Sequence, residues 1–331
     1  MPEIIQLKEN HLEDAATLVS SHYINLREQN PDLPQSYTQA ATLLPLLQSI
    51  IRTGCPGVAA LDNGKLVGFF TGWQMPSFRG KRSTYSPEWA NATTSENSQR
   101  IYEEMYTRLA DIWVAEHYVD HYISLFANNV LALKVWYWMN FGMISVDALR
   151  GLEPIGGKSG VYIRRADLQD IELVMELREA LRQYMQGTPV YLLTDKRDRS
   201  YYAKWVQNPE KVVWLAYWQD EPAAFMQMGP ADDDVCTIIY DEKTTSIYAA
   251  YTEEKVRSAG LATALLDHAL EAALASGYER CAVSFEPMNL LGTRFWLKHF
   301  QPVCFSVVRH VDERLTRSKN DIYKDKELMD E

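Results

Sequence analysis

The stretch from 257 to 262, RSAGLA, has the residue types of an anion-binding loop. It follows an apolar run at 247–252 that is typical of a buried strand, and it precedes a helical pattern that ends before Gly277. A helix start leaves backbone N–H groups unpaired and carries partial positive charge. Gly260 lets an anion approach the backbone closely, and Lys255 and Arg257 add full positive charge. The stretch therefore predicts a phosphate or pyrophosphate site at this helix start.

The pattern R-x-x-G-x-A between a strand and a helix resembles the pyrophosphate loop of the GNAT superfamily of N-acetyltransferases, which bind acyl-coenzyme A. It lacks the G-K-[ST] of a Walker loop and two of the three glycines of a dinucleotide fingerprint. The resemblance implies that acetyl-coenzyme A is the co-substrate, and no metal is expected. The implied cofactor-binding residues are Ala250, Tyr251, Thr252, Arg257, Ser258, Ala259, Gly260, Leu261, Ala262 and Asn289. Asn289 can equally serve as the N-cap of a helix over 290–300.

The expected reaction is attack of a neutral amine on a thioester, which needs alignment, a base and stabilisation of the oxyanion or the leaving thiolate. Glu286, at the end of the strand beside the cofactor strand, is the best candidate for the catalytic base. Asp241 and Glu242 are weaker candidates. For each of the three, an exposed acid or an ion pair, such as one with Arg294, is the competing interpretation.

The usual general acid of the superfamily is missing from its expected position. Many members carry a tyrosine seven residues after the asparagine, and counting from Asn289 gives Trp296. An indole N–H donates hydrogen bonds but is no acid at working pH. Either the thiolate leaves unassisted, or another hydroxyl serves, or this copy is not catalytic.

Composition and charge exclude several other classes of protein. The chain has 331 residues, of which 47% are hydrophobic, so a packed core is expected. A net charge of −11 argues against nucleic-acid binding and mildly favours cationic substrates such as amines. No apolar run suits a membrane span, and the first residues are too polar for a signal peptide. Four unpatterned cysteines fit a cytoplasmic protein.

The two halves of the sequence read as copies of one unit. Leu12 aligns with Leu168, Gly68 with Ala224 and Asn129 with Asn289, at a spacing of about 160 residues. Each copy reads β-α-α-β-β-(β)-α-β-α-β, which is the order of the GNAT superfamily. The predicted fold class is therefore α/β (an α+β mixed sheet), with two tandem domains over 1–153 and 154–331.

The first copy is expected to be degenerate. Residues 74–100 are polar and rich in turn formers, and the basic run 79–82 is interpreted as a solvated loop before a helix over 101–116. No pyrophosphate loop is found there, so this copy is expected to act as a scaffold and as one wall of the acceptor site. The aromatic residues are mostly assigned to the core, with Tyr201, Tyr202 and Trp205 as candidates for the acceptor side.

The sequence thus predicts an N-acetyltransferase that acts on a primary amine of a small molecule or peptide, without nucleic acid or membrane partners. The alternative is a protein that binds acyl-coenzyme A without turnover, as a sensor or structural partner. The oligomeric state is left open.

Overall fold

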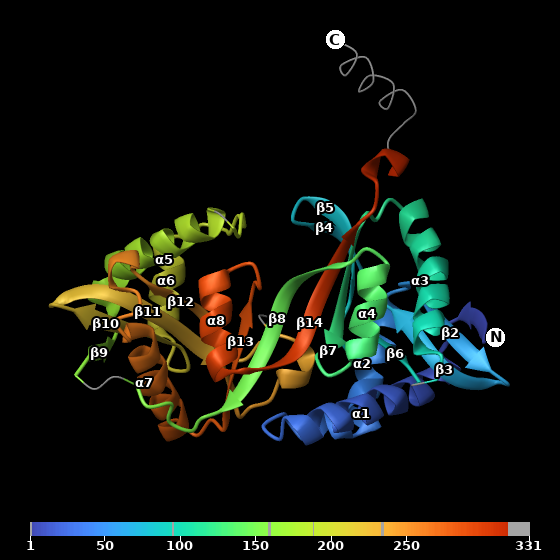
Figure 1. The fold of residues 1–331 in the computed structure, drawn as a ribbon, viewed down its shortest axis with the longest axis horizontal. Coiled ribbons are helices and arrows are strands. Elements are labelled where there is room, and N and C mark those ends of the chain that lie inside the picture. Colours follow the sequence, from blue (N-terminus) through green and yellow to red (C-terminus); the bar gives the residue numbers. More distant parts are fainter. Residues whose placement is uncertain (1, 95, 158–159, 188, 233–234, 317–331) are drawn as a thin grey trace, which may run out of the picture. The chain divides into compact units, whose positions relative to one another are not determined.

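The computed structural model describes residues 2–94, 96–157, 160–187, 189–232 and 235–316, which form two compact units (Figure 1). Unit 1 comprises 1–31, 35–144 and 304–331, and unit 2 comprises 32–34 and 145–303. Within the described residues, no helix is both long enough and apolar enough to cross a membrane.

Unit 2 carries the organising stretch of the sequence. Its sheet has the strand order β8-β13-β12-β11-β10-β9, in which only β12 and β13 run parallel. Helices α5 and α7 both pack on β11 and β12 (Figure 1). The elements are β8 (Gly142–Gly151), β9 (Tyr162–Arg165), α5 (Ile171–Gln186), α6 (Arg199–Gln207), β10 (Val212–Trp218), β11 (Glu221–Pro230), β12 (Thr244–Thr252), α7 (Leu261–Ala275), β13 (Arg280–Phe285) and α8 (Leu290–His299).

Local sequence explains most of these elements. In α5, Ile171, Val174 and Leu177 recur at helical spacing and are buried on the sheet. Helix α7 is rich in alanine and leucine, the best helix formers, and Gly277 follows it at φ 88°, a conformation that glycine adopts without strain. The predicted strand, loop and helix at 247–277 are therefore confirmed.

Each half of the chain gives its last strand to the other unit. Strand β8 pairs with β13, from Val146 opposite Phe285 to Gly151 opposite Arg280. Strand β14 (Gln301–His310) pairs with β7 (Asp120–Phe126), with His310 opposite Asp120. A division at 153/154, as the sequence predicts, separates each of these strands from the sheet that it joins. Local sequence cannot reveal the exchange, because an apolar strand pattern does not specify which edge it will pair with.

Unit 1 contains two four-stranded sheets, ordered β1-β2-β3-β6 and β4-β5-β7-β14. Its core gathers aromatic side chains of α3 and α4 on β2 and β3. The elements not yet given are β1 (Glu3–Gln6), α1 (Leu12–Gln29), α2 (Ala40–Arg52), β2 (Gly57–Asp62), β3 (Lys65–Thr71), β4 (Trp73–Phe78), β5 (Lys81–Ser86), β6 (Asn91–Thr93), α3 (Ser98–Ala115) and α4 (Val130–Trp138).

The segment 74–100 is not the polar loop that its composition suggests. It holds β5, β6 and most of β4, and Arg79 and Gly80 form only the tight turn between β4 and β5, at φ 50° and 82°. Several of its polar residues are buried, and the Asn91 side chain donates to the carbonyls of Pro87 (3.2 Å) and Ser124 (3.1 Å). Buried polar strands lack the alternation from which strands are predicted.

Strands β5 and β6 together take the place that β12 holds in unit 2. β5 pairs with β7 in parallel, as β12 does with β13, while β6 pairs with β3, as the end of β12 does with β11. The sheet of unit 1 is therefore interrupted where that of unit 2 is continuous. At Gly72, between β3 and β4, a Cβ would lie 2.7 Å from the Tyr85 carbonyl oxygen, so only glycine fits.

Candidate functional site

The central pair of strands in unit 2 separates halfway along its length. Parallel pairing runs from Thr244 opposite Arg280 to Ile247 opposite Val283 and stops there, although β12 continues on β11 to Thr252. A β-bulge falls at the same point, because the register on β11 skips Tyr248. Bulges bend a strand and increase its twist, which accounts for the divergence. The β12 backbone beyond the bulge is thereby left without a strand partner on the side of β13.

A cavity of about 400 Å³ opens at this divergence. It extends from the end of β12 to the start of α7 and is bounded by α5 and α8. Its lining includes Ala250, Tyr251, Thr252, Arg257, Ser258, Gly260, Leu261, Ala262 and Asn289, all predicted for the cofactor. Of the predicted set, only Ala259 is absent from the lining; its N–H donates to the Val256 carbonyl at 3.3 Å.

The loop between β12 and α7 lines this cavity and leads into the helix start. Ser258 (φ 66°) and Gly260 (φ 91°) both adopt left-handed conformations, and Gly260 is the N-cap of α7. At this end of α7, the Ala264 N–H donates to the Gly260 carbonyl at 3.0 Å. The preceding N–H groups of a helix start have no intrahelical acceptor. Such donors, together with the helix dipole, suit the binding of an anion.

Of the two basic residues predicted to assist the loop, only Arg257 lines the cavity. Its Nε donates to the Thr252 carbonyl at 3.2 Å, and its guanidinium lies 4.8 Å from the centre of the Tyr184 ring. Lys255 is instead exposed and pairs with Glu253 at 2.8 Å. The prediction of positive charge from Lys255 is therefore wrong, because a nearer carboxylate takes its ammonium.

Asn289 is the N-cap of α8, as one interpretation predicts, and it also lines the cavity, where its contact with a cofactor stays a prediction. Its Oδ1 accepts from Gly292 N–H at 3.1 Å, as the N-cap of α8, and from the Tyr184 hydroxyl at 2.9 Å, inside the cavity. Gly292 makes room for this, since a Cβ there would lie 2.7 Å from Asn289 Nδ2. Sequence reasoning missed Tyr184, which comes from α5, 105 residues earlier in the chain.

A second cavity, of about 250 Å³, adjoins the first. Both are lined by Leu181, Ala250, Asn289 and Trp296, so these four residues mark the seam between them. Glu286 lines the second cavity from the end of β13. All lining residues of both cavities belong to unit 2.

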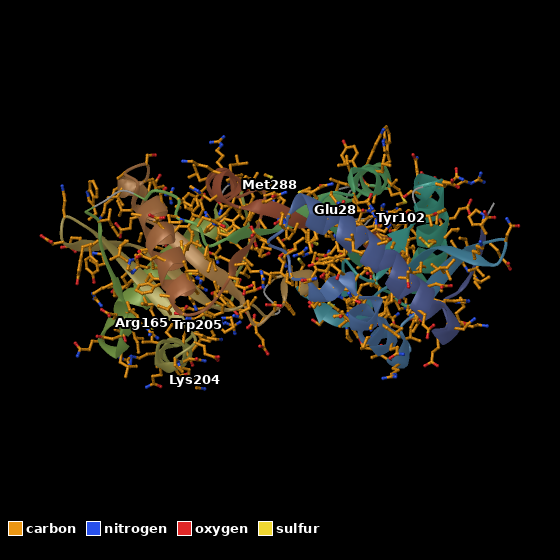
Figure 2. The ribbon with its side chains drawn as sticks, turned by 90° about the horizontal axis from the view of Figure 1, so that it is seen from below. Glu28, Tyr102, Arg165, Lys204, Trp205 and Met288 are labelled. Carbon is orange, nitrogen blue, oxygen red and sulfur yellow. The ribbon has the colours of Figure 1, made fainter. Side chains whose placement is uncertain are left out.

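The other predicted residues are divided between this cavity and the core. Tyr202 lines the second cavity, whereas Trp205 on α6 (Figure 2) packs with its ring centre 4.9 Å from that of Tyr248. Tyr201 packs against the same core. Asp241 and Glu242 precede β12 at the end away from the divergence, and Asp241 pairs with Arg280 at 2.8 Å. Neither lines either of the two cavities, which favours the competing interpretation of an exposed acid or an ion pair.

Three carboxylates line the second cavity, and two of them are held by arginines. Arg182 donates to Glu179 at 2.8 and 2.5 Å and lowers the pKa of Glu179 to about 2. Asp195 is largely exposed and lies 3.7 Å from Arg197. A carboxylate held ionised by an arginine is a poor proton acceptor. Glu286 is the remaining carboxylate.

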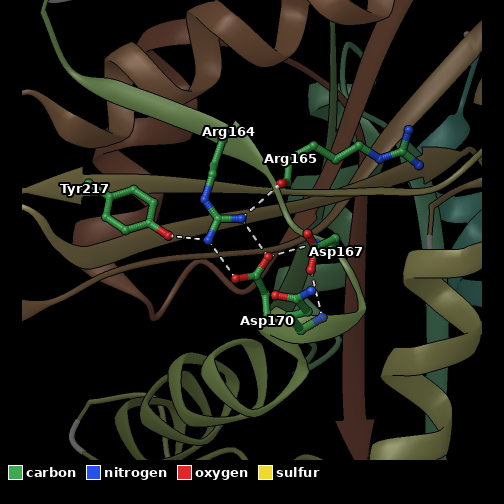
Figure 3. A network of polar contacts seen from close by, with 6 residues as sticks. Arg164, Arg165, Asp167, Asp170 and Tyr217 are labelled. Atoms are coloured by element: carbon green, nitrogen blue, oxygen red, sulfur yellow. Dashed lines mark hydrogen bonds and ion pairs between the residues drawn. The ribbon is translucent and has the colours of Figure 1, made fainter.

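A polar network fixes the start of α5, which supplies much of the wall (Figure 3). Arg164 on β9 donates two hydrogen bonds of 2.6 Å to Asp170 and one of 2.6 Å to the Tyr217 hydroxyl. The Arg164 hydrogen bonds are the main cause of the lowered pKa of Asp170. The Asp167 side chain accepts from Gln169 N–H at 2.7 Å and caps the short 3-10 turn that precedes α5.

The corresponding place in unit 1 is occupied by the protein's own side chains. His22 Nε2 lies 2.9 Å from the Thr93 carbonyl, and the hydroxyls of Thr93 and Ser98 are 2.6 Å apart. A cavity of about 170 Å³ remains, and its described lining contains no lysine or arginine. The arrangement lacks the cationic loop of unit 2.

A mixed sheet whose parallel pair diverges beside a helix start, with a cavity on each side, defines the GNAT fold. Residues 175–300, which contain both cavities, match the model of the Acetyltransferase (GNAT) family, and this part of the chain belongs to that family. None of the curated proteins compared with the chain matches it.

Two solved structures extend the likeness beyond this segment. The GCN5-related N-acetyltransferase from Sphaerobacter thermophilus is similar over 93% of this chain and 95% of its own, with a TM-score of 0.58 and 11% identity. The glucosamine N-acetyltransferase region of a fungal multi-domain β-N-acetylglucosaminidase is similar over 93% of this chain and 38% of that chain, with a TM-score of 0.53 and 10% identity. At such identities the likeness is one of fold.

Proposed function

We propose that the protein is an N-acetyltransferase that transfers an acetyl group from acetyl-coenzyme A to a primary amine. The observation that carries the proposal is the pair of cavities that meet at Ala250, Asn289 and Trp296. One cavity is lined by the loop and helix start at 257–262, and the other is lined by the carboxylate of Glu286. Two substrates entering from opposite sides would meet where β12 and β13 diverge.

The residues of the first cavity fit coenzyme A. The start of α7 and Arg257 would hold the pyrophosphate, because both offer donors and positive charge to an anion. The β12 backbone from Ala250 to Thr252, without a strand partner on this side, would pair with the amides of the pantetheine arm. The acyl group would then lie at the seam.

The second cavity would deliver the amine. Glu286 would accept a proton from the ammonium, and the neutral nitrogen would attack the thioester carbon. As the tetrahedral intermediate collapses, the carbon–sulfur bond breaks and the amide forms. The thiolate would take a proton from the Tyr184 hydroxyl, the described hydroxyl that contacts Asn289 within the cavity. The nitrogen would lose its second proton as the amide forms, and this proton would restore the Tyr184 hydroxyl through solvent.

A second function, binding of acyl-coenzyme A without turnover, is favoured by Trp296. This indole stands at the seam, 8% exposed, where it can supply no proton. In the first function, a suitable amine releases the free thiol of coenzyme A. In the second function, no amine does so.

The remaining parts of the proposal concern the whole chain. Unit 1 would serve as a scaffold, so one coenzyme A should bind per chain. All four cysteines are free, which supports action in a reducing compartment such as the cytoplasm.

The test is calorimetric titration of the full chain with acetyl-coenzyme A, followed by measurement of free thiol with a panel of primary amines. We expect one binding site and amine-dependent thiol release. Binding without release from any amine would support the second function. Absence of binding would refute both, and two sites per chain would refute a degenerate unit 1.

A further inference from the structure

The amine-side cavity, the second one described above, is richer in cations than the acidic chain suggests. Its lining holds four basic residues (Arg178, Arg182, Lys196 and Arg197) and three acidic ones (Glu179, Asp195 and Glu286). Arg182 is engaged by Glu179 and Arg197 by Asp195. Outside these two pairs, the lining holds Arg178 and Lys196 as cations and Glu286 as a carboxylate.

Arg178 stands out among these cations. It lies on α5, is half-buried, and has no hydrogen bond or ion pair with any residue in the described ranges. The other half-buried arginines of unit 2 all have partners: Arg150, Arg164, Arg182, Arg257 and Arg280. Burying a guanidinium is costly unless an acceptor compensates. A ligand in the cavity with such an acceptor would therefore bind favourably to Arg178.

The position of Arg178 suits a group on a small acceptor. Leu181, which faces both cavities, follows it by three residues, or about 4.5 Å along the helix axis. Arg178 therefore lies about one helical turn from the seam. A guanidinium presents a planar fork of donors that matches a carboxylate in two parallel hydrogen bonds.

We infer that the acceptor carries a carboxylate beside its amine, as an amino acid does, and that Arg178 binds this carboxylate while the ammonium lies toward Glu286. The inference rests on the proposed function and names the class of its substrate. It also revises the preference for simple cationic amines that the net charge suggests, because the charge of the cavity differs in sign from that of the chain.

The first experiment measures binding and needs no turnover. The full chain, saturated with coenzyme A, is titrated calorimetrically with each common amino acid and with the amine that its decarboxylation would give. We expect at least one amino acid to bind and its decarboxylated partner to bind at least tenfold more weakly. Equal binding within the pairs, or no binding by any amino acid, would overturn the inference.

Variants then assign the effect to the residue. Arg178→Gln should remove the preference for the carboxylate and leave the affinity for coenzyme A unchanged. The matched control is Arg199→Gln on α6, an exposed arginine that pairs with Glu172 outside the cavity. A preference that survives Arg178→Gln would contradict the assignment.

A phosphate-bearing amine tests whether Arg178 binds a carboxylate or a phosphate. O-phosphoethanolamine and ethanolamine are compared in the same titration, since a guanidinium also binds phosphate. Tighter binding of the phosphate compound than of any amino acid would overturn the carboxylate in favour of a phosphate. Carboxylate binding without thiol release would leave this inference standing while the proposed transfer fails.

Discussion

At the scale of single residues, Glu286 is the proposed base because of its position. It lines the amine-side cavity from the end of β13, whereas Glu179 is held by Arg182 and Asp195 is largely exposed. We expect Glu286→Gln to lower kcat about 100-fold, within the usual contribution of a general base. The loss of the acidic limb of the pH–rate profile would identify the missing group.

The control for this variant is Glu242→Gln, which changes an exposed carboxylate at the other end of β12. It should leave kcat unchanged. If Glu286→Gln is as active as the parent, with unchanged affinity for acetyl-coenzyme A, another group is the base.

Tyr184 tests whether a hydroxyl outside α8 assists the leaving thiolate. Tyr184→Phe removes the hydrogen bond to Asn289 and the proton donor while retaining the ring under Arg257. We expect kcat to fall about tenfold or more, with the dissociation constant of acetyl-coenzyme A changed less than threefold. Stopped-flow measurement of thiol release separates the two quantities.

Trp296→Tyr in the Tyr184→Phe background supplies the contrasting case. The substitution restores a hydroxyl at the seam, on α8, where many members of the superfamily carry one. Recovery of part of the lost rate would support a need for a hydroxyl. If Tyr184→Phe alone retains the full rate, the thiolate leaves without help from this residue.

At the scale of elements, the helix start of α7 is the feature that should decide cofactor binding. Gly260→Val places a side chain at a left-handed position that faces the cavity. Gly277→Val places the same side chain at the other end of α7, also at positive φ and in open space. Both variants should lose similar stability, roughly 1–2 kcal/mol, while only Gly260→Val should lose affinity for acetyl-coenzyme A.

Calorimetric titration and urea unfolding of the two glycine variants give the comparison. An equal loss of affinity in both would mean that strain in α7, and not access to the loop, controls binding. An unchanged affinity in Gly260→Val would remove the loop from the site.

A buried contact between His121 on β7 and Tyr106 on α3 predicts that the stability of the protein depends on pH. Burial lowers the pKa of His121 on β7 to about 4, and its ring nitrogens contact the Tyr106 hydroxyl (2.9 Å) and the Tyr118 carbonyl (3.1 Å). The neutral ring contributes fully above pH 6.5. As the pH falls from 6.5 to 4, the unfolded chain takes up the proton first, and up to roughly 3 kcal/mol is lost.

Urea unfolding of His121→Gln between pH 4 and 7 tests this. The variant should be less stable at pH 7, but its stability should fall less steeply toward pH 4 than that of the parent. His117→Gln, at an exposed position, should keep the parent's slope. Parallel curves for His121→Gln and the parent would exclude His121 as the source.

The comparison of sequence with structure also belongs to this scale. The loop at 257–262 and the helix after it could be predicted because glycine, small residues and apolar spacing act locally. Tyr184 and Arg178 could not, since both reach the cavities from α5, about 100 residues before Glu286 and Asn289. Strands β5 and β6 were missed because Ser83, Thr84 and Asn91 are polar and yet buried, which composition alone does not show.

At the scale of the whole molecule, the exchanged strands make the two halves of the sequence dependent on each other. A fragment of residues 154–331 lacks β8 and leaves the edge of β13 open, while 1–153 lacks β14 and leaves β7 open. We expect each fragment alone to be aggregated or unfolded and their co-expression to restore a soluble complex. Circular dichroism and size-exclusion chromatography provide the readout.

The control fragment is 145–303, which keeps β8 beside β13 within unit 2. It should be more stable to urea than 154–331, although the two differ little in length. A cooperative, monomeric 154–331 as stable as 145–303 would show that β8 is dispensable.

Because of the strand exchange, unit 2 can complete its sheet during synthesis before unit 1 can, although the synthesis of unit 1 begins first. Every strand of unit 2 has been made once β13 has left the ribosome, whereas β7 waits for β14, which comes after all of unit 2. At ordinary translation rates, the residues between β7 and the end of β14 take roughly 10–40 s to make. For that interval one edge of β7 has no strand partner, so chaperones or other copies of the chain can bind to it. The half that is made first is thus the half that folds last.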